Sequence, residues 1–468
     1  MKFKVVISTE RSEWRNLYKS VSLKEISRLR HFVPTLEMTE KRTLEMTEKR
    51  TLEIEFPGIL CLRPNRRSIN PIIDKKFLIL RIMKLEEVIA AQMRQKLRKK
   101  LPLWAETQGV EIPSSLSLEQ CSGQETALYK AEVALRIAGP GATIADLTGG
   151  LGVDSWAFSQ KFKTVLYNEA LTPLAEAAAR NFKALGRNNI IISNQTATPA
   201  TLETILGTIG PNIIYLDPAR RAENGKKVFL LEDCSPDILA LKDKLLAASP
   251  NLLVKLSPMA DITMLLERLG PTCREIIVVC ADGECKELLV RMQRDWSGRP
   301  TLTIYEDGFT STFEESPTRP FSFDYGDTVL APGPEQLTES TGNIIFEPGK
   351  SLTKAGLFNL PCRHYFKLGR HTHLYIGKQT GSTEKEPLPG KYFRITEAMP
   401  LGSSVIKALS KQNLRADVSC HNVPIKSEEL RRRLKAQSDH KYHIFAAHAD
   451  FTQAAPGNYL FITEVLNS

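Results

Sequence analysis

The chain has 468 residues, more than one hydrophobic core normally holds, so two or three domains are expected. Hydrophobic residues make up 42% and charged residues 25%, which is typical of a globular protein and excludes a disordered or fibrous chain. The formal net charge of +10 suits a polyanionic partner such as RNA, although general solubility explains a modest basic excess equally well.

The lengths of the apolar runs indicate where the protein resides, and the spacing of the cysteines indicates whether it binds a metal. No apolar stretch has the length that a membrane span needs, and the amino-terminal apolar patch is too short for a signal peptide. The eight cysteines form no CxxC pair and no metal-ligand spacing, so we interpret them as free thiols, Cys280 and Cys285 included. His371 and His373 have strand spacing but no Cys or carboxylate companions. The sequence predicts a cytoplasmic protein with no metal site and no membrane partner.

The amino-terminal part carries a tandem repeat. The octapeptide TLEMTEKR occupies 35–42 and recurs unchanged at 43–50, and its apolar spacing fits no sustained helical face. Met83 then opens an amphipathic helical pattern. We expect residues 1–82 to be an extension that the function does not require, with the functional chain beginning near Met83.

The remaining chain changes character twice. Residues 83–140 have a helical pattern, and from 141 to 331 short apolar runs alternate with helices, as in βαβ units with a mainly parallel sheet. Seven strands are expected there, with 275–292 counted as one strand. A Pro-Gly-Pro linker at 332–334 precedes a mixed α/β region at 335–468.

A glycine turn marks the first candidate site. In ADLTGGLGVDSWAF (145–158), an apolar strand ends at Asp146 and three glycines (Gly149, Gly150 and Gly152) precede a helix. The dinucleotide fingerprint GxGxxG fits poorly, because Ser155 occupies the third glycine position. Asp146 and Asp154 would also repel a pyrophosphate. They favour a cationic ligand with an amino group, such as S-adenosylmethionine.

Two later strand ends carry acids. Glu169 follows the next strand and can accept hydrogen bonds from both ribose hydroxyls, a feature that NAD enzymes share. Asp217-Pro218 follows the strand NIIYL, at the edge where open α/β sheets bind ligands. Asp217 could orient or deprotonate an acceptor there, and a plain turn is the alternative.

These motifs together resemble a known family. DLTGGLGVD, YNEA and YLDPARR are similar to class I S-adenosylmethionine-dependent methyltransferases. The stretches FEPGKSLTKAGLFNL and NVPIKSEELRRRLKA resemble the bacterial members with a C-terminal THUMP-like domain. The resemblance implies a Rossmann-like methyltransferase domain at 141–331 with a mainly parallel seven-stranded sheet. It also implies an N-terminal helical region at 83–140 and a mixed α/β THUMP-like domain at 335–468.

The resemblance also assigns residues. The cofactor S-adenosyl-L-methionine would be bound by Asp146, Gly149, Gly150, Gly152, Glu169, Gln195, Gln124 and Thr126, although helix capping explains Thr126 equally well. The catalytic set would be Asp217, Pro218 and Arg220, with Arg220 stacking on a base or pairing with phosphate. Lys255 could face the same site, or extend from its strand end to solvent.

The acceptor is less constrained. The aromatic residue typical of base N-methylating enzymes is absent after Asp217-Pro218, and no cysteine follows the next strand, which argues against covalent carbon methylation. We predict an RNA methyltransferase acting on tRNA or rRNA, with the basic run 431–435 as an RNA-facing patch or a solvated helix face. The alternatives are an RNA-binding protein with a vestigial cofactor fold, or a methyltransferase acting on a protein or small molecule.

Overall fold

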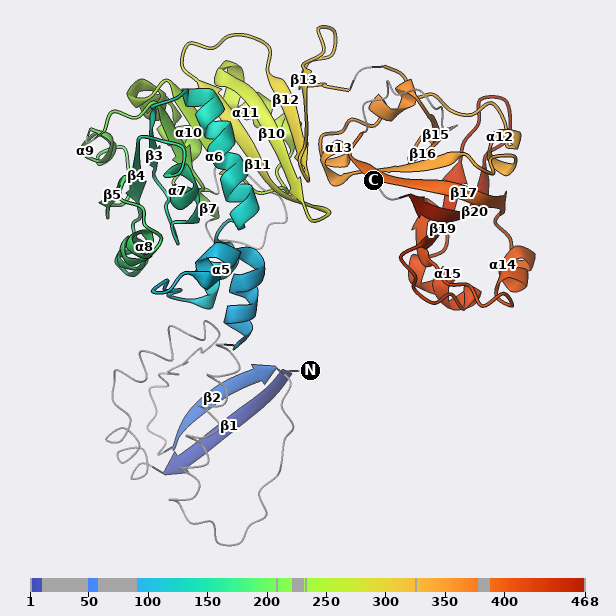
Figure 1. Ribbon diagram of the computed structural model, residues 1–468, viewed down its shortest axis with the longest axis horizontal. Coiled ribbons are helices and arrows are strands. Elements are labelled where there is room, and N and C mark those ends of the chain that lie inside the picture. Colours follow the sequence, from blue (N-terminus) through green and yellow to red (C-terminus); the bar gives the residue numbers. More distant parts are fainter. Residues whose placement is uncertain are drawn as a thin grey trace. The chain divides into compact units, whose positions relative to one another are not determined.

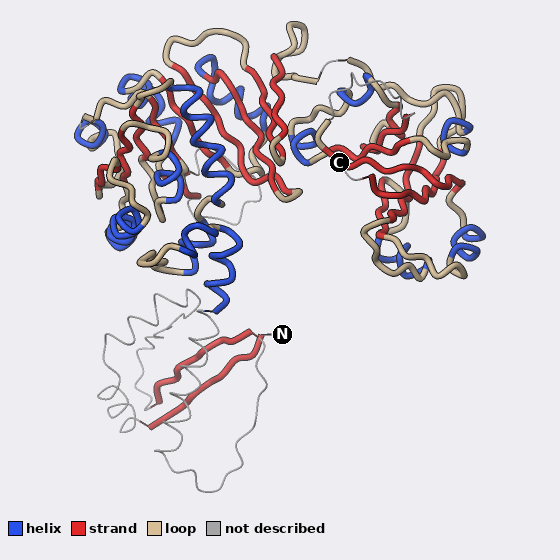
Figure 2. Tube along the Cα trace, viewed as in Figure 1, coloured by secondary structure: helices blue, strands red, loops and turns tan. Residues whose placement is uncertain are grey.

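The computed structural model describes residues 2–10, 49–57, 91–207, 209–220, 231, 234–324, 326–377 and 388–466. The chain divides into two compact units, Met1–Pro211 and Asn212–Ser468. Their helices and strands are drawn in Figures 1 and 2. Strands β1 (Lys2–Glu10) and β2 (Lys49–Pro57) pair antiparallel. The repeat lies outside the described residues except for its last two, which begin β2, and the helical pattern from Met83 is described only from residue 91.

The first unit places helices around three parallel strands (Figure 1). The expected alternation is confirmed, and α6 ends where Gly139 takes a positive φ of 83°. The elements are helical residues 91–100, α4 (Pro102–Glu106), α5 (Ser115–Gln120), α6 (Gln124–Ala138), β3 (Thr143–Asp146), α7 (Val153–Phe158), β4 (Thr164–Asn168), α8 (Thr172–Ala184), β5 (Ile190–Ser193) and α9 (Leu202–Leu206).

The second unit opens with strand β6 and continues with alternating strands and helices. Asp237 and Asp261 cap α10 and α11, accepting hydrogen bonds from backbone N–H groups three residues on, as N-cap acids do. The elements are β6 (Ile213–Leu216), β7 (Ala219–Arg220), β8 (Cys234–Ser235), α10 (Ile238–Ala248), β9 (Asn251–Leu256), α11 (Ile262–Leu269), η2 (Gly270–Thr272), β10 (Cys273–Ala281), β11 (Glu284–Gln293), β12 (Thr301–Glu306) and β13 (Phe309–Glu314).

The predicted number of seven strands is wrong, whereas the mainly parallel character holds in part, because β3–β4, β4–β5, β6–β9 and β10–β12 pair parallel. The sheet has nine strands in the order β13-β12-β10-β11-β9-β6-β3-β4-β5. Strand β11 is inserted between β9 and β10 and runs antiparallel to both, and β13 runs antiparallel to β12. The sheet is therefore mixed, with β11 and β13 antiparallel to their neighbours.

Two Asp-Gly turns account for the additional strands. Asp282 and Gly283 have φ of 52° and 70°, and Asp307 and Gly308 have φ of 47° and 91°. Ala281 pairs with Glu284 across the first turn, so the loop has two residues, as in a tight hairpin with two left-handed positions. The stretch 275–292 is consequently two strands, and a hairpin partner follows β12.

The C-terminal region forms a second, seven-stranded sheet in the order β15-β16-β14-β17-β20-β19-β18. The mixed α/β pattern expected there is confirmed. One hydrophobic cluster includes Phe393, Phe445 and Phe461, and a second contains Leu430 and Leu434 of α15. The elements are α12 (Glu335–Thr338), β14 (Ile344–Pro348), α13 (Lys350–Lys354), η3 (Leu360–Arg363), β15 (Phe366–Gly369), β16 (Thr372–Gly377), β17 (Gly390–Pro400), α14 (Ser403–Leu409), β18 (Asp417–His421), α15 (Ser427–Leu434), β19 (Tyr442–Ala449) and β20 (Gly457–Leu466).

A buried carboxylate joins the end of β12 to α13. Glu306 is 8% exposed and accepts hydrogen bonds from the backbone N–H groups of Lys350 and Ser351, at 2.9 and 3.0 Å, and from the Ser351 hydroxyl at 2.6 Å. A Cβ on Gly349 would lie 2.2 Å from the same carboxylate. Residues 348–351 (Pro-Gly-Lys-Ser) are thus where the C-terminal region contacts the larger sheet within this unit.

Candidate functional site

The glycine turn follows β3 and has little room for side chains. A Cβ on Gly149 would lie 2.1 Å from the Tyr167 ring, and one on Gly152 would lie 2.6 Å from the Phe182 ring. Gly150 and Gly152 also have positive φ, 54° and 92°, which L-residues rarely adopt. Glycine at these positions therefore lets the backbone pass directly over the aromatic pair.

Asp146 organises the turn from inside. Its carboxylate is 1% exposed and accepts hydrogen bonds from the Thr148 backbone N–H at 3.1 Å and from the Ser155 hydroxyl at 2.7 Å. These two donors stand before and after the glycines, so the acid holds the loop closed across its base. The expected bond to a ligand amino group would come in addition to these contacts.

Glu169 follows β4 and reaches the same turn. Its Oε2 accepts a hydrogen bond from the Gly150 N–H at 2.8 Å, and its Oε1 accepts one from the Leu171 N–H at 2.8 Å. The Tyr167 hydroxyl donates to the Gly150 carbonyl at 2.6 Å. Burial, with the charges of Glu169 and Asp146 nearby, raises the pKa of Tyr167, so the hydroxyl remains a donor. Both the backbone N–H and the backbone carbonyl of Gly150 are thereby hydrogen-bonded.

Asn168 connects three strand ends and was not predicted. Its Nδ2 donates to the carbonyls of Leu147 at 3.2 Å and Gln195 at 2.9 Å, and its Oδ1 accepts from the Gln195 N–H at 3.2 Å. Asn168 is 1% exposed. The predicted residues Asp146, Glu169 and Gln195 therefore lie at one edge of the three parallel strands, with the Gln195 backbone held in place.

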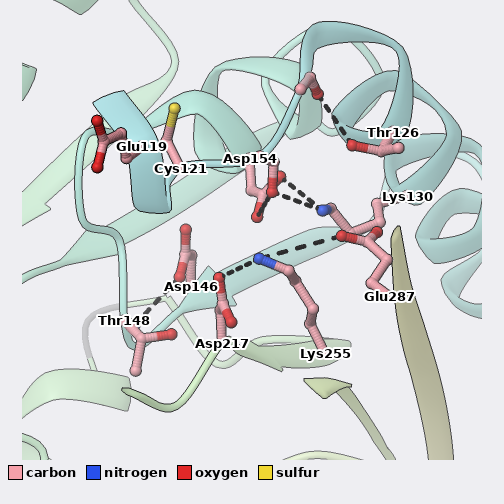
Figure 3. Close-up of polar contacts among 12 residues, drawn as sticks. Glu119, Cys121, Thr126, Lys130, Asp146, Thr148, Asp154, Asp217, Lys255 and Glu287 are labelled. Atoms are coloured by element: carbon pink, nitrogen blue, oxygen red, sulfur yellow. Dashed lines mark hydrogen bonds and ion pairs between the residues drawn. The ribbon is translucent and has the colours of Figure 1, made fainter. Parts of the chain in front are cut away.

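Asp154 has a different partner from the one its position suggested. Its carboxylate pairs with Lys130 Nζ of α6 at 3.1 Å (Figure 3). Ser122 Oγ donates a hydrogen bond to Asp154 at 3.0 Å and accepts one from Lys130 at 2.7 Å. The Lys130 side chain is 0% exposed and that of Asp154 is 9% exposed. The charge of Asp154 is balanced by protein, so it offers no net attraction to a cationic ligand. The pair instead fixes α7, and with it the glycine turn, against α6.

Gln124 and Thr126 lie at the start of α6. Gln124 Oε1 accepts a hydrogen bond from the Leu103 N–H at 3.0 Å, and the buried Thr126 hydroxyl donates to the Gly123 carbonyl at 3.1 Å. Both bonds run to neighbouring backbone rather than to the glycine turn. The N-cap of α6 is Gly123 and has no side-chain cap hydrogen bond, so the structure does not show the helix capping suggested for Thr126.

The second unit holds a charged row that begins at Asp217. Asp217 follows β6, and its Oδ2 lies 2.5 Å from Lys255 Nζ of β9 (Figure 3). Lys255 Nζ is also 4.0 Å from Oε2 of Glu287 on β11, whose side chain is 3% exposed. The exposed fractions of the Lys255 and Asp217 side chains are 14% and 32%. A lysine from the middle of the sheet thus links a buried acid to an acid open to solvent.

Pro218 and Arg220 continue from Asp217. Pro218 is half-buried, and Arg220 pairs with Cys234 in the short β7–β8 ladder. The side chain of Arg220, and Arg221 with it, lies outside the described part of the chain.

Neither a metal cluster nor a membrane span is found in the described residues. No group of three or more His, Cys, Asp or Glu side chains there could hold a metal ion, and no helix there is long and apolar enough to cross a bilayer. His371 lies in the turn between β15 and β16 rather than on a strand, so it does not share a strand face with His373.

The chain is similar to a protein of solved structure over most of its length. The family model of the THUMP domain-like family matches residues 390–465, and no curated protein sequence matches. A crystal structure from Porphyromonas gingivalis W83, of a protein described as a methyltransferase, is 31% identical with a TM-score of 0.66, covering 80% of this chain and 89% of that one. A protein from Pyrococcus horikoshii described as an RNA methyltransferase is 13% identical, with a TM-score of 0.29 over 43% of this chain and 96% of that one.

The Pyrococcus match is too distant to bear on function, whereas the Porphyromonas protein matches in sequence and in fold across most of both chains. The glycine turn, the acids at the strand ends and the matched C-terminal region agree with that similarity. The chain belongs to the class I methyltransferases that carry a C-terminal THUMP-like domain.

Proposed function

We propose that the protein transfers a methyl group from S-adenosylmethionine to RNA, tRNA or rRNA being the expected substrates. The observation that carries the proposal is the glycine turn, whose Gly150 peptide is bound by Glu169 and whose base is closed by Asp146. Backbone that is this tightly packed against Tyr167 can lie close to a ligand without side chains intervening.

The residues at this turn suit the proposed cofactor. Glu169 is half-buried and offers carboxylate oxygens, which accept hydrogen bonds from ribose hydroxyls. The glycines would border the methionine end, and Gln195 the adenine. When bound, the cofactor supplies an electrophilic methyl group, and the protein has to bind and orient the acceptor.

Asp217 is the proposed acceptor-orienting residue, with Pro218 shaping its turn and Arg220 contacting the RNA. Because Lys255 Nζ donates a hydrogen bond to Asp217 Oδ2 at 2.5 Å, the orientation of the carboxylate is fixed. A carboxylate held this way is a hydrogen-bond acceptor for an N–H or O–H group on the substrate. We infer that its main role is orientation.

RNA is favoured as the acceptor because of the C-terminal domain. Residues 390–465 match the THUMP domain-like family, and THUMP domains are associated with RNA modification. The net charge of +10 favours the same partner. We propose that residues 335–468 deliver the RNA, that 141–331 carry out the transfer in the cytoplasm, and that 83–140 support the cofactor turn.

The test is transfer of labelled methyl groups from S-adenosylmethionine into bulk RNA from cells that lack this gene. The wild type should label RNA, Asp217→Ala should bind the cofactor without labelling, and Glu169→Ala should lose cofactor binding in calorimetry. Asp243→Asn, an exposed acid on α10, is the matched control and should label RNA normally. Cofactor binding without RNA labelling would move the acceptor to a protein or small molecule. Absence of cofactor binding in the wild type would refute the proposal.

A further inference from the structure

Two cysteines face each other across the β10–β11 hairpin. Cys280 and Cys285 are direct register partners in the antiparallel pair, one step from the Ala281–Glu284 pair that flanks the two-residue turn. Both are free thiols. Opposed residues in an antiparallel ladder have Cα atoms about 4.5–5.5 Å apart, within the range of about 4.4–6.8 Å that a disulfide spans.

The two thiols already interact. The Cys280 thiol donates a hydrogen bond to the Cys285 sulfur, which raises the pKa of Cys280 and lowers the pKa of Cys285. The Lys354 ammonium of α13 lowers the pKa of Cys285 further. Lys354 is held in place, since its Nζ donates to the Ala260 carbonyl at 2.7 Å. The pair thus has one thiol that ionises more readily and one that is bonded to it.

The cysteine that ionises more readily is also the more exposed of the two. Cys280 is 0% exposed, whereas Cys285 is half-buried and open to small solutes. A register shift lies at this point of the ladder, where Val279 pairs with Glu287 and Cys280 pairs with Cys285, so Lys286 is an extra residue on β11. Bulges of this kind loosen the local ladder and re-aim side chains.

We propose that Cys280 and Cys285 form a dithiol site that hydrogen peroxide converts reversibly to an intramolecular disulfide. The Cys285 thiolate attacks one peroxide oxygen, so that an S–O bond forms, the O–O bond breaks and hydroxide leaves. Cys280 then gives up its proton and attacks the Cys285 sulfur, so that the S–S bond forms and a second hydroxide leaves. Two thiols are oxidised, one peroxide is reduced, and two water molecules result.

The position of the pair argues for a reversible site rather than a structural staple. A disulfide here would close a loop of only six residues, 280–285, and short loops gain the least from cross-linking. The hairpin turn already holds the two strands together without it. The bond would therefore contribute little to stability, and thiol reductants would reopen it.

The experiment treats the purified full-length protein with hydrogen peroxide, alkylates the remaining thiols and maps the tryptic peptides. Cleavage after Arg274 and Lys286 releases both cysteines in one peptide, 275–286. We expect this peptide to be lighter by two hydrogen atoms and unalkylated, and dithiothreitol to restore alkylation. Cys362 and Cys420 are matched controls, because they are half-buried as well and burial raises the pKa of each. They should oxidise at least about tenfold more slowly.

The Cys280→Ser variant separates the two steps. In it, Cys285 should stop at sulfenic acid, which dimedone traps, whereas the wild type should yield little dimedone adduct. Two results would overturn the proposal: full alkylation of both cysteines after peroxide treatment, or sulfinic acid on Cys285 in the wild type with Cys280 still alkylatable. The measurement detects the state of the two thiols and not methyltransferase activity, so its outcome does not depend on the proposed function.

Discussion

Lys255 Nζ lies 2.5 Å from Asp217 Oδ2, although the two residues are 38 positions apart in the chain. Glu287, almost completely buried, lies on the other side of the same ammonium group at 4.0 Å. The Lys255 ammonium group therefore interacts with both carboxylates. Glu287 compensates the charge of Lys255 within the sheet, and Lys255 in turn orients Asp217 toward the edge of the strands.

Replacing Lys255 should lower methyl transfer more than cofactor binding. In Lys255→Met, Asp217 loses its orienting donor, and we expect the turnover rate to fall by about 10–100-fold, which is less than removal of a catalytic group typically costs. The Kd for S-adenosylmethionine in calorimetry should stay within about threefold, because Lys255 orients the acceptor side.

Lys255→Arg is the control for this prediction. Arginine keeps the positive charge between the two acids, so it should fold normally and recover part of the turnover. Equal loss of cofactor affinity and turnover in Lys255→Met would contradict the assignment, since it would indicate a general loss of structure.

The glycine turn should not tolerate a methyl group at position 149. In Gly149→Ala, the new Cβ would overlap the buried Tyr167 ring at 2.1 Å, so we expect destabilisation of about 1–3 kcal/mol and loss of cofactor binding. Gly402→Ala is a matched control, because its Cβ would meet nothing nearer than 3.9 Å. Its cost should stay under about 1 kcal/mol. Urea denaturation and calorimetry with S-adenosylmethionine measure the two effects, and normal binding by Gly149→Ala would refute the close packing.

Breaking the Lys130–Asp154 pair should be costly. Lys130→Met leaves the Asp154 carboxylate buried without its cation, and such changes typically cost about 3–5 kcal/mol. The double variant Lys130→Met/Asp154→Leu should recover much of that loss, because no uncompensated charge remains. Tryptophan fluorescence during urea denaturation is a suitable probe, since Trp104 and Trp156 are buried and in contact in the same unit. Additive effects of the two single changes would argue against a coupled pair.

The C-terminal domain should lose stability in mild acid. Burial lowers the pKa of His443 to about 4, with Lys391 and His421 acting in the same direction and Asp417 partly opposing them. The unfolded chain, with a His pKa near 6.5, binds a proton that the folded chain excludes. Neutral His443 therefore contributes fully to the free energy of unfolding above pH 6.5. This contribution, up to about 3 kcal/mol, is lost as the pH falls toward 4.

His443→Gln isolates this effect. Glutamine keeps a polar partner for the Ser419 hydroxyl, which lies 2.9 Å from His443 Nε2, but does not titrate. Unfolding measured at several pH values from 4 to 7 should show a steeper fall in the wild type than in the variant. Parallel curves would mean that His443 already carries its proton in the folded state.

Much of the fold could be predicted because the signals are local. Apolar runs of four to six residues between amphipathic helices predicted β3, β4, β5, β6 and β9. The two Asp-Gly turns were equally visible in the sequence, and weighing them would have predicted the split of 275–292 and the additional strand β13. The error in strand number was therefore one of interpretation.

The partners of the charged residues could not be predicted in this way. Asp154 beside the glycine turn suggested a ligand contact, but Lys130 from the neighbouring helix pairs with it. For Lys255 the sequence left two possibilities open, and only the pairing of β6 with β9 brings it to Asp217.

The sequence by itself determined where strands, helices and turns occur and which acids stand at strand ends, because backbone preferences and apolar periodicity depend on near neighbours. The tertiary structure alone decided which acids pair with a lysine, which glycines have an aromatic ring against them and which cysteines face each other. Those relationships depend on strand order and register, which bring together residues far apart in the chain.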